Sequence, residues 1–477
     1  MSTAIDTRAL TQHIDSVWDQ SIVPTLSEYI RIPNKSAAYD PQWEQNGHMD
    51  RAAELLRKWC EAHALPGMKI ELMRLPKRSP LLYIEVPATA AASNDAVLMY
   101  GHMDKQPEFT GWLPGLDPWT PVLRDGRLYG RGGADDGYAV FGSLLALRAL
   151  AEQKIPHARC VILIEAGEES GSPDLPAYID ALADRIGAPS LVVCLDAECG
   201  NYDQLWCTTS LRGNLNGVLK VQVLTEGVHS GSASGIVTSS FRIARQLLAR
   251  IEDAASGELL LPELNGSIPS DRVAQAKAAA KALGDQVYRK FPFVAGMRPM
   301  VQDESELLLN STWRPTLSVT GVEGIPPLSS AGNVLRPGTS LMLSFRLPPN
   351  VDGQVAAKAI KQALESDPPY GAKVEFDAEA SFGGWNAPVT AAWLESALQG
   401  ASRAFFGRDS MYMGTGGSIP FMGMLGEKFP DTQFMITGVL GPHSNAHGPN
   451  EFLDIATGKR VTACVAWVVA EHAKRAK

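Results

Sequence analysis

Short apolar runs alternate with stretches of helical periodicity along the first part of the chain. The apolar runs are Ala96–Tyr100, Arg159–Ile164 and Leu191–Leu195. Runs of this length and composition are typical of strands that are buried on both faces of a parallel sheet. Apolar positions with helical spacing occur over residues 7–30, 47–63 and 138–153. The alternation predicts an α/β fold, in which helices cover a mostly parallel sheet.

The pattern changes to the order βαββαβ between about residue 211 and residue 381. Strands are expected at residues 215–225, 313–321, 340–347 and 373–380, and helices at 235–251 and 351–365. This is the order of a split, ferredoxin-like α+β domain. A long insertion at residues 252–310, with a helix expected at 273–290, interrupts it.

Residues from about 382 onward return to the first kind of pattern. They are expected to form a helix, a strand and a C-terminal helix at residues 391–405, 433–440 and 456–477. A chain of 477 residues exceeds what one hydrophobic core usually supports. We therefore expect one domain formed by residues 1–210 and 382–477, and a second domain, residues 211–381, inserted into it.

Polar side chains that can bind a metal ion follow each of the three apolar runs. His102 and Asp104 come after the first run, Glu168 and Glu169 after the second, and Asp196 after the third. In open α/β sheets the functional crevice lies beyond the carboxyl ends of the strands. We therefore expect these five side chains to meet at one edge of the sheet.

Glu168 and Glu169 lie between Gly167 and Gly171, which allow the backbone to turn sharply after the strand. Adjacent carboxylates repel each other, and a divalent cation would compensate that repulsion. One glutamate would then be a ligand, and the other would be free for proton transfer. The alternative interpretation is a solvated acidic turn, because acidic pairs are common in loops.

A glycine-rich turn at residues 128–137 contains a further candidate, Asp135. A phosphate-binding loop is the competing interpretation of this turn. Its spacing matches neither the Rossmann pattern nor the P-loop pattern, and no P-loop lysine follows. The glycine-rich segment at residues 414–418 fails the same comparison, so nucleotide binding is not expected.

Two histidines complete the candidate set. Asp104, two residues after His102, can accept the second ring N–H of a ligating imidazole. The alternative for His102 is a hydrogen-bonded histidine of the core. His447 follows the last expected strand of the first domain, so it can reach the same edge of the sheet. Two histidines, three carboxylates and a spare glutamate together offer enough nitrogen and oxygen ligands for two zinc-like ions.

The charge balance favours two divalent ions over one. Two ions carry four positive charges, of which the carboxylates of Asp135, Glu169 and Asp196 remove three. A bridging hydroxide would remove the fourth and leave the site neutral. With a single ion, the same carboxylates would carry uncompensated negative charge.

Composition and charge narrow the class of protein. The net charge of −9 argues against a nucleic-acid or anionic-membrane partner, because no basic excess is available to release counterions. The first residues lack the features of a signal peptide, and no apolar run approaches the length of a membrane span. The six cysteines are scattered without a CxxC pair. We therefore expect a reduced, cytoplasmic protein.

The candidate residues occur in segments that resemble the M20 family of co-catalytic metallopeptidases, and most closely its carnosinase-like dipeptidase branch. The similarity spans nearly the whole chain in the family's order. The segments are Tyr100-Gly-His-Met-Asp104, Gly130-Arg-Gly-Gly-Ala-Asp-Asp136, Glu165-Ala-Gly-Glu-Glu-Ser-Gly171, Val228-His-Ser-Gly231 and Ser444-Asn-Ala-His-Gly-Pro-Asn-Glu451.

The resemblance implies a role for each residue of the metal set. Asp135 would bridge two ions, zinc first and manganese or cobalt as alternatives. His102 and Asp196 would complete the shell of one ion, and Glu169 and His447 that of the other. The peptide bond after Asp135 would be cis. In the segment that contains Asp196, Cys194-Leu-Asp-Ala-Glu-Cys199, this chain departs from carnosinases, which tend to have Ser-Asp. Glu198 is therefore an alternative ligand, less favoured than Asp196.

The resemblance also implies a mechanism. Glu168 would be the general base that takes a proton from the bridging water, and would then deliver it to the departing amine. Asp104 would orient His102 and act with Glu168 in the catalytic set. His447 would face the substrate as well as the metal.

The second domain would act as a lid and mediate a homodimer. In resembling proteins its histidine, here His229, reaches into the partner's site to stabilise the oxyanion. A loop histidine with a local partner is the alternative. Asn333, Arg346 and Ser418 would hold the terminal carboxylate of the substrate, since the planar fork of arginine suits carboxylates. Asn333 stands where carnosinases have threonine.

These expectations describe a dinuclear metal-dependent hydrolase that cleaves the amide bond of dipeptides or short peptides. Within enzymes, the alternative is an N-acyl-amino-acid deacylase or desuccinylase of the same family. From another class, the alternative is a non-catalytic peptide-binding protein. Loss of Glu168 or of a ligand would indicate that class, and all of them are present.

Overall fold

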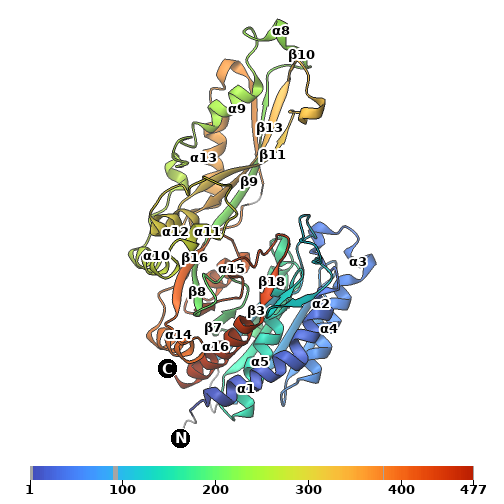
Figure 1. The fold of residues 1–477 in the computed structure, drawn as a ribbon, viewed down its shortest axis with the longest axis vertical. Helices are drawn as coiled ribbons and strands as arrows, with labels where there is room; N and C mark the ends of the chain where they lie inside the picture. The colour runs from blue at the N-terminus through green and yellow to red at the C-terminus, as the bar shows by residue number, and fades with distance from the viewer. Residues whose placement is uncertain (1–3, 90–94, 380, 476–477) are drawn as a thin grey trace. The chain divides into compact units, whose positions relative to one another are not determined.

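The computed structural model describes residues 4–89, 95–379 and 381–475, which divide into two compact units (Figure 1). The first unit comprises Met1–Thr209, Ala387–Met413 and Met424–Lys477, and the second comprises Ser210–Asn386 and Gly414–Gly423. The expected boundaries assigned the segment Gly414–Gly423 to the first domain. It packs instead with the second unit, where its Gly416 carbonyl accepts a hydrogen bond from Arg212 Nε (3.3 Å).

A six-stranded sheet, of order β1-β2-β6-β3-β7-β17, organises the first unit. The four strands from β6 to β17 run parallel, and β2 is antiparallel to both of its neighbours, β6 and β1. The mostly parallel sheet expected from the sequence is confirmed, and the antiparallel edge is an addition to it. The strands are β1 (Lys69–Met73), β2 (Leu81–Val86), β3 (Ala96–His102), β6 (Arg159–Glu165), β7 (Pro189–Cys194) and β17 (Gln433–Ile436).

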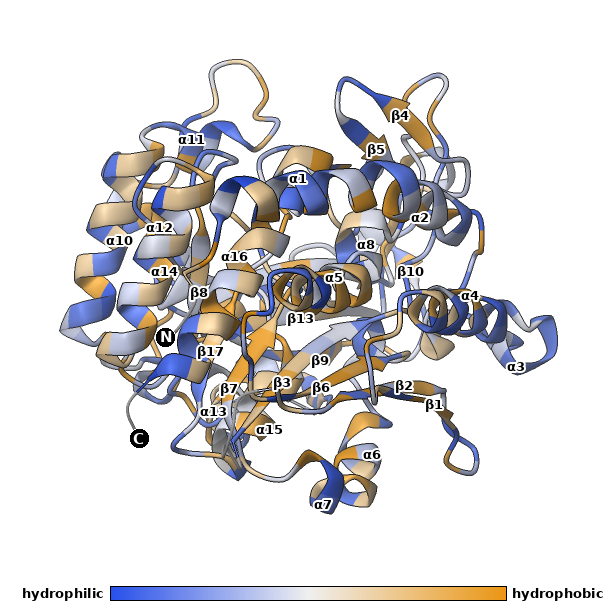
Figure 2. Cartoon of the chain, turned by 90° about the horizontal axis from the view of Figure 1, so that it is seen from below, coloured by the Kyte–Doolittle hydropathy of each residue, from blue (hydrophilic) through white to orange (hydrophobic). Residues whose placement is uncertain are grey.

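Helices cover both faces of this sheet. In Figure 2, α1, α4, α5 and α16 lie over one face, and the short helices α6 and α7 lie over the other. The helices of the first unit include α1 (Thr7–Val17), α2 (Val23–Ile30), α3 (Trp43–Asn46), α4 (His48–Ala62), α5 (Ala139–Glu152), α6 (Leu175–Ala181), α7 (Ala183–Ile186), α14 (Ala392–Phe405) and α16 (Ile455–Lys474). A small sheet of β4 (Val122–Arg124), β5 (Arg127–Tyr129) and β18 (Phe452–Asp454) accompanies them.

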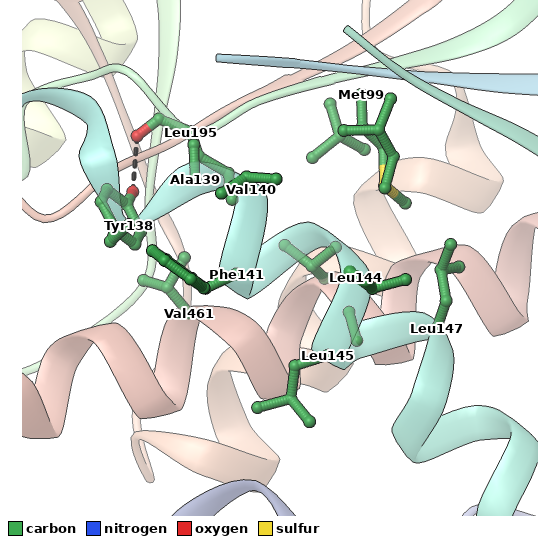
Figure 3. Close-up of a cluster of buried hydrophobic side chains, with 14 of the residues drawn as sticks. Met99, Tyr138, Ala139, Val140, Phe141, Leu144, Leu145, Leu147, Leu195 and Val461 are labelled. Carbon is green, nitrogen blue, oxygen red and sulfur yellow. Dashed lines mark hydrogen bonds between the residues drawn. The ribbon is translucent and has the colours of Figure 1, made fainter. Parts of the chain in front are cut away.

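The core of the first unit is centred on α5, which is apolar around most of its circumference and buried along most of its length. Phe141 and Leu144 of α5 belong to one buried cluster with Met99 of β3 and Val461 of α16 (Figure 3). At its start, the hydroxyl of Tyr138 donates to the carbonyl of Leu195 (2.5 Å). This bond ties the beginning of α5 to the chain just beyond β7.

The helix expected over residues 7–30 consists of α1 and α2 joined by a π-helical turn, η1 (Trp18–Ile22). Trp18 is fully buried, and its Nε1 donates to Thr462 Oγ1 (3.2 Å). A Cβ at Gly458 would lie 2.5 Å from the indole ring. The absence of a side chain at that position therefore lets α16 lie against Trp18.

The second unit contains a four-stranded antiparallel sheet of order β11-β13-β9-β14, with α9 and α13 packed on its buried face. This confirms the expected βαββαβ arrangement. Its elements are β9 (Gly213–Gln222), α9 (Ser240–Leu248), β11 (Thr316–Glu323), β13 (Gly338–Leu347), α13 (Gly353–Glu365) and β14 (Lys373–Ala378). Burial alternates strictly along β13, so every second side chain lies on the face away from the helices.

The insertion of the second unit is helical, as expected, although its helix is divided. It contains α10 (Ser270–Leu283), α11 (Gln286–Arg289) and α12 (Glu304–Thr312). A two-stranded sheet pairs β10 (Val228–His229) with β12 (Val334–Leu335) beside α8 (Ser230–Ala233). The expected strand end at Ala380 and the last two residues of the expected C-terminal helix lie outside the described residues.

The chain passes from one unit to the other through β8 (Trp206–Leu211), β15 (Trp385–Asn386), β16 (Met411–Thr415) and α15 (Pro420–Lys428). All six cysteines are buried, and none of them forms a disulfide. Among the described residues, no helix combines the length and the apolar composition that a membrane span requires.

Candidate metal centre

The carboxyl ends of three adjacent parallel strands meet at one edge of the six-stranded sheet. The central strand β3 ends at His102, and its neighbours β6 and β7 end at Glu165 and Cys194. Beyond β6 the chain turns into η4 (Glu168–Ser170), and beyond β7 it reaches Asp196 two residues later. The strand register therefore delivers candidate ligands from three separate segments to one place.

Asp135 lies between two histidines. Its Oδ1 is 3.1 Å from His102 Nε2, and its Oδ2 is 3.1 Å from His447 Nε2. Each nitrogen is approached by a second carboxylate: Asp196 Oδ2 lies 3.8 Å from His102 Nε2, and Glu169 Oε2 lies 3.2 Å from His447 Nε2. The five side chains thus form two groups that share Asp135.

The donor atoms are close enough together to surround a metal ion. Two triplets have ligand atoms that all lie within 4.8 Å of one another: His102 with Asp135 and Glu169, and His102 with Glu168 and Asp196. Glu169 Oε1 is buried and accepts no hydrogen bond from any described residue. A buried carboxylate oxygen without a donor is costly, and a cation would satisfy it. The residues present therefore fit divalent ions.

Asp104 joins the two strands that carry His102 and the glutamate pair. Its Oδ1 accepts from the backbone N–H of Glu168 (3.1 Å), and its Oδ2 accepts from that of Glu169 (3.0 Å). His102 Nδ1 lies 3.1 Å from the Asp104 carbonyl and 3.4 Å from its Oδ1. One fully buried aspartate thus orients both the imidazole ring and the turn.

The electrostatics of the centre are those of crowded, buried carboxylates. Burial, reinforced by the negative charge of Asp196, raises the pKa of Glu168 well above its usual range. Burial also raises the pKa of Asp196 to about 7. Burial opposes protonation of His102, but hydrogen bonds to Asp104 and Asp135 outweigh it and raise the pKa of the imidazole. Such an edge holds protons, or other cations, tightly.

The peptide bond after Asp135 and the burial of Asp196 can be compared with what the sequence predicts. The Asp135–Asp136 peptide bond is cis, as the resemblance implies. Glu198, the alternative to Asp196, is exposed and belongs to neither triplet, whereas Asp196 is only 9% exposed.

The four remaining candidates belong to the second unit. His229 and Asn333 are exposed neighbours beside β10 and β12, where the N–H of Ser230 donates to the Asn333 carbonyl (2.9 Å). Arg346 lies near the far end of β13, eight residues beyond its start at Gly338. At about 3.3 Å per residue, these eight steps span about 26 Å. Arg346 therefore lies about 26 Å from the end of β13 that follows Asn333 in the chain.

Ser418 lies on the Arg346 side of the second unit. Its hydroxyl donates to the carbonyl of Arg212 (2.5 Å), and Arg212 Nη1 donates to Thr316 Oγ1 (3.2 Å). Thr316 is the cross-strand partner of Arg346. Burial, with the positive charge of Arg346 added, lowers the pKa of Arg212 to about 10. The two guanidinium groups make this end of the sheet receptive to an anion.

Sequence reasoning missed several residues that shape the site. Gln106 Nε2 donates to Glu169 Oε2 (2.7 Å). Arg131 and Glu451 form a buried ion pair (2.6 Å). Arg131 and Glu451 both lie within the family-like segments, but only their contacts in space reveal what they do. The position of Gln106, two residues after Asp104, was the available signal for its role.

The comparisons with known proteins agree on one family. The model of peptidase family M20/M25/M40 matches residues 98–471. The chain is 29% identical over 370 residues to a cysteinylglycine-S-conjugate dipeptidase of Corynebacterium striatum, covering 75% of this chain and 77% of the relative. It is 29% identical over 378 residues to the Beta-Ala-His dipeptidase of Homo sapiens, covering 74% of this chain and 70% of the relative.

Solved structures share the fold. Human carnosine dipeptidase 1 superposes with a TM-score of 0.78 at 22% identity, covering 99% of this chain and 100% of the other. An M20 family metallo-carboxypeptidase from Sulfolobus solfataricus superposes with a TM-score of 0.77 at 20% identity, covering 96% and 100%. A Bacillus subtilis protein described as a dinuclear metal-binding M20 peptidase gives 0.57 at 12% identity, covering 97% and 100%.

Proposed function

Because the chain belongs to peptidase family M20/M25/M40, as the match over residues 98–471 shows, we propose that it is a dinuclear metal-dependent dipeptidase. The observation that carries the proposal is the pair of ligand groups that share Asp135. The curated relatives are dipeptidases by name, which supports a dipeptide or short peptide as substrate.

In this proposal His102 and Asp196 would hold one ion, Glu169 and His447 would hold the other, and Asp135 would be a ligand of both. Imidazole nitrogen and carboxylate oxygen suit zinc, with manganese and cobalt as alternatives. When bound, the ions supply the Lewis acidity that polarises the scissile carbonyl and favours deprotonation of water.

Glu168 moves the protons of the reaction. It takes one from the attacking water and delivers it to the departing amine. Burial supports this role, because it raises the pKa of the carboxyl and so makes Glu168 a better proton acceptor than an exposed glutamate. Asp104 holds the turn that carries Glu168 through the Glu168 N–H (3.1 Å), and so fixes where that proton transfer occurs.

Arg346 and Ser418 bind the carboxylate end of the substrate in this proposal, with the charge of Arg212 beside them. A planar guanidinium binds a carboxylate through two hydrogen bonds. Burial lowers the pKa of Arg346, so a bound anion would restore part of the solvation that burial removes.

His229 and Asn333 act in the site of a second copy in this proposal, which makes the enzyme a homodimer. The separation of about 26 Å from Gly338 to Arg346 along β13 supports this reading, because one chain cannot bring both ends to one substrate. The edge strand β11 also exposes apolar side chains, Val319 at 50% and Val322 at 53%, which suits a surface between two subunits.

A charged substitution in the edge strand β11 tests whether the protein is a dimer. Val322→Glu should convert the protein to a monomer in sedimentation and abolish turnover, because a buried charge disfavours association. Val355→Glu is the matched control: Val355 is 50% exposed on α13, outside β11, and its variant should remain a dimer. A fully active monomer would contradict the proposal.

Metal analysis combined with a substrate panel tests the catalytic proposal. We expect two divalent ions per chain, with dipeptides cleaved faster than N-acetyl and N-succinyl amino acids. The reverse preference would identify a deacylase. Metal binding without hydrolysis of any substrate would indicate a peptide-binding protein.

The role of Glu168 is tested by Glu168→Gln. We expect retained metal with turnover reduced by about 10²- to 10⁴-fold, the usual contribution of a general base. Near-normal turnover would show that Glu168 is not the base. Because none of the six cysteines forms a disulfide, we also propose that the enzyme works in the reducing cytoplasm.

A further inference from the structure

The loop that carries His447 is held partly by hydrogen bonds of its own, such as that from the N–H of Gly448 to the carbonyl of Asn445 (2.9 Å). It lies between β17 and β18, outside any helix or strand, and the side chain of His447 is 56% exposed. Four non-glycine residues in and around it have positive φ angles: His443, Asn445, His447 and Asn450. Such conformations are strained and persist only where surrounding contacts impose them. Contacts from outside the loop therefore add to its own hydrogen bonds in fixing the backbone of His447.

Arg131 and Glu451 supply those contacts. The carboxylate of Glu451 accepts from Arg131 Nη1 (2.6 Å) and from the backbone N–H of Gly132 (2.9 Å). Arg131 Nη2 donates to the carbonyl of Gly448 (2.7 Å), and the N–H of Gly130 donates to the carbonyl of Glu451 (3.0 Å). Four hydrogen bonds thus join the His447 loop to the loop that carries Asp135.

The pair is buried and close to both candidate ligands. Arg131 is 1% exposed and Glu451 is 0% exposed, so water does not compete for these bonds. Gly448 directly follows His447, and Gly132 precedes Asp135 by three residues. A displacement at the ion pair therefore reaches both ligands through very short stretches of backbone.

We propose that the buried Arg131–Glu451 pair is a positioning device that sets the distance between Asp135 Oδ2 and His447 Nε2, now 3.1 Å, and thereby the affinity for the ion held by His447. The inference rests on the proposed dinuclear site. It assigns to these two residues no contact with the substrate. Their effect should be largest on the ion that His447 would hold, because Arg131 bonds to the residue next to His447, and smaller on the ion of His102 and Asp196, which shares only Asp135.

The chemistry of the two side chains makes the roles of charge and geometry separable. In Glu451→Gln, the amide nitrogen can only donate, so either Arg131 or the N–H of Gly132 loses its acceptor. In Arg131→Lys, a point charge can still pair with Glu451 but cannot also reach the carbonyl of Gly448 in the fixed fork of a guanidinium. Arg131→Lys therefore keeps the ion pair while it releases the His447 loop.

The test is a calorimetric titration of chelator-treated, full-length protein with Zn²⁺. The wild type should bind two equivalents. Both Glu451→Gln and Arg131→Lys should weaken one equivalent by about 10- to 100-fold, the usual effect of a residue that orients a ligand, and affect the other equivalent much less. Adding Glu451→Gln to His447→Ala should cause little further loss, because both changes act on the same ion.

The matched control is Asp95→Asn. Asp95 pairs with Arg475, and this pair is also largely buried (14% and 15% exposed), but it does not join the ligand loops. Its variant should lower the melting temperature and bind both equivalents normally.

Two outcomes separate the inference from the function on which it rests. If the wild type binds two equivalents and both variants do as well with unchanged affinity, the pair only stabilises the fold and the inference is overturned. If the wild type binds fewer than two, the dinuclear proposal itself fails. Should Glu451→Gln not fold, Arg131→Lys decides the question alone.

Discussion

Asp104 is the residue whose replacement should expose most directly how the glutamate turn is held. Its carboxylate is fully buried and accepts two backbone N–H bonds, from Glu168 (3.1 Å) and Glu169 (3.0 Å). Asp104→Asn keeps the shape of the side chain but has only one acceptor atom. Whichever way the amide points, one of the two N–H groups then faces another donor.

The cost follows from these two bonds. A buried N–H left without an acceptor costs about 1–3 kcal/mol, and changing the other bond from charged to neutral removes about 1 kcal/mol. We therefore expect Asp104→Asn to destabilise the turn locally by about 2–4 kcal/mol. Asp104→Ala leaves both N–H groups unpaired, and its cost should be larger, about 2–6 kcal/mol.

Hydrogen exchange of metal-free protein measures this cost at the turn itself. Since 1.4 kcal/mol corresponds to a factor of ten, the amides of Glu168 and Glu169 should exchange about 30- to 1,000-fold faster in Asp104→Asn. Turnover of the metal-loaded enzyme should fall by about 10- to 100-fold, because the base and one ligand lose their orientation.

A control variant makes the same Asp→Asn change at another aspartate that accepts a backbone N–H. Asp174 also accepts a backbone N–H, that of Ser79 (2.8 Å), through a partly buried carboxylate. Asp174→Asn should leave exchange at Glu168 and Glu169 unchanged. If these two amides exchange within threefold of the wild-type rate in Asp104→Asn, the account of the turn is wrong.

Two further predictions concern stability. Burial lowers the pKa of His472 to about 4 in the folded state, against about 6.5 unfolded. The folded state therefore binds the proton less well, so stability should be full above pH 6.5 and fall as the pH decreases toward 4. The loss should approach about 3 kcal/mol in urea unfolding and be absent in His472→Gln. Two glycine variants separate steric clash from backbone strain. Gly132 (φ +80°) and Gly115 (φ +82°) have nearly the same φ angle, but only a Cβ at Gly132 would meet Lys105, at 2.5 Å. Gly132→Ala should therefore lower stability by about 1–3 kcal/mol more than Gly115→Ala, and equal melting temperatures would refute the steric argument.

The strands that could be predicted are those whose own residues form a continuous apolar run in the sequence. β3, β6 and β7 are nearly continuous apolar runs, and the ligands follow directly at their ends. The edge strand β1 is only half-buried and carries no comparable run. β2 is apolar and buried like the predicted strands, so the signal for it was present and unused.

The ligand distances around Asp135 agree with the groups implied by the resemblance, and the metal roles stay predictions until an ion is measured. The Arg131–Glu451 pair could not be predicted, because its members lie 320 positions apart and neither has a local pattern. Asn333 and Arg346 were expected to hold the same carboxylate. That role stays a prediction: Arg346 lies near the end of β13 that is far from Gly338, so the proposed dimer would supply the two residues from different chains.

The main segment of the second unit, Ser210–Asn386, begins and ends at hydrogen-bonded neighbours. Trp385 and Asn386 pair antiparallel with Leu211 and Ser210, and on the side of the first unit the N–H of Ala387 donates to the Thr209 carbonyl (3.0 Å). In topological terms the insert is therefore an enlarged hairpin turn. A tight two-residue connection between these strands would close the ladder in its place, so the pairing of Thr209 with Ala387 does not depend on the length of the segment between them.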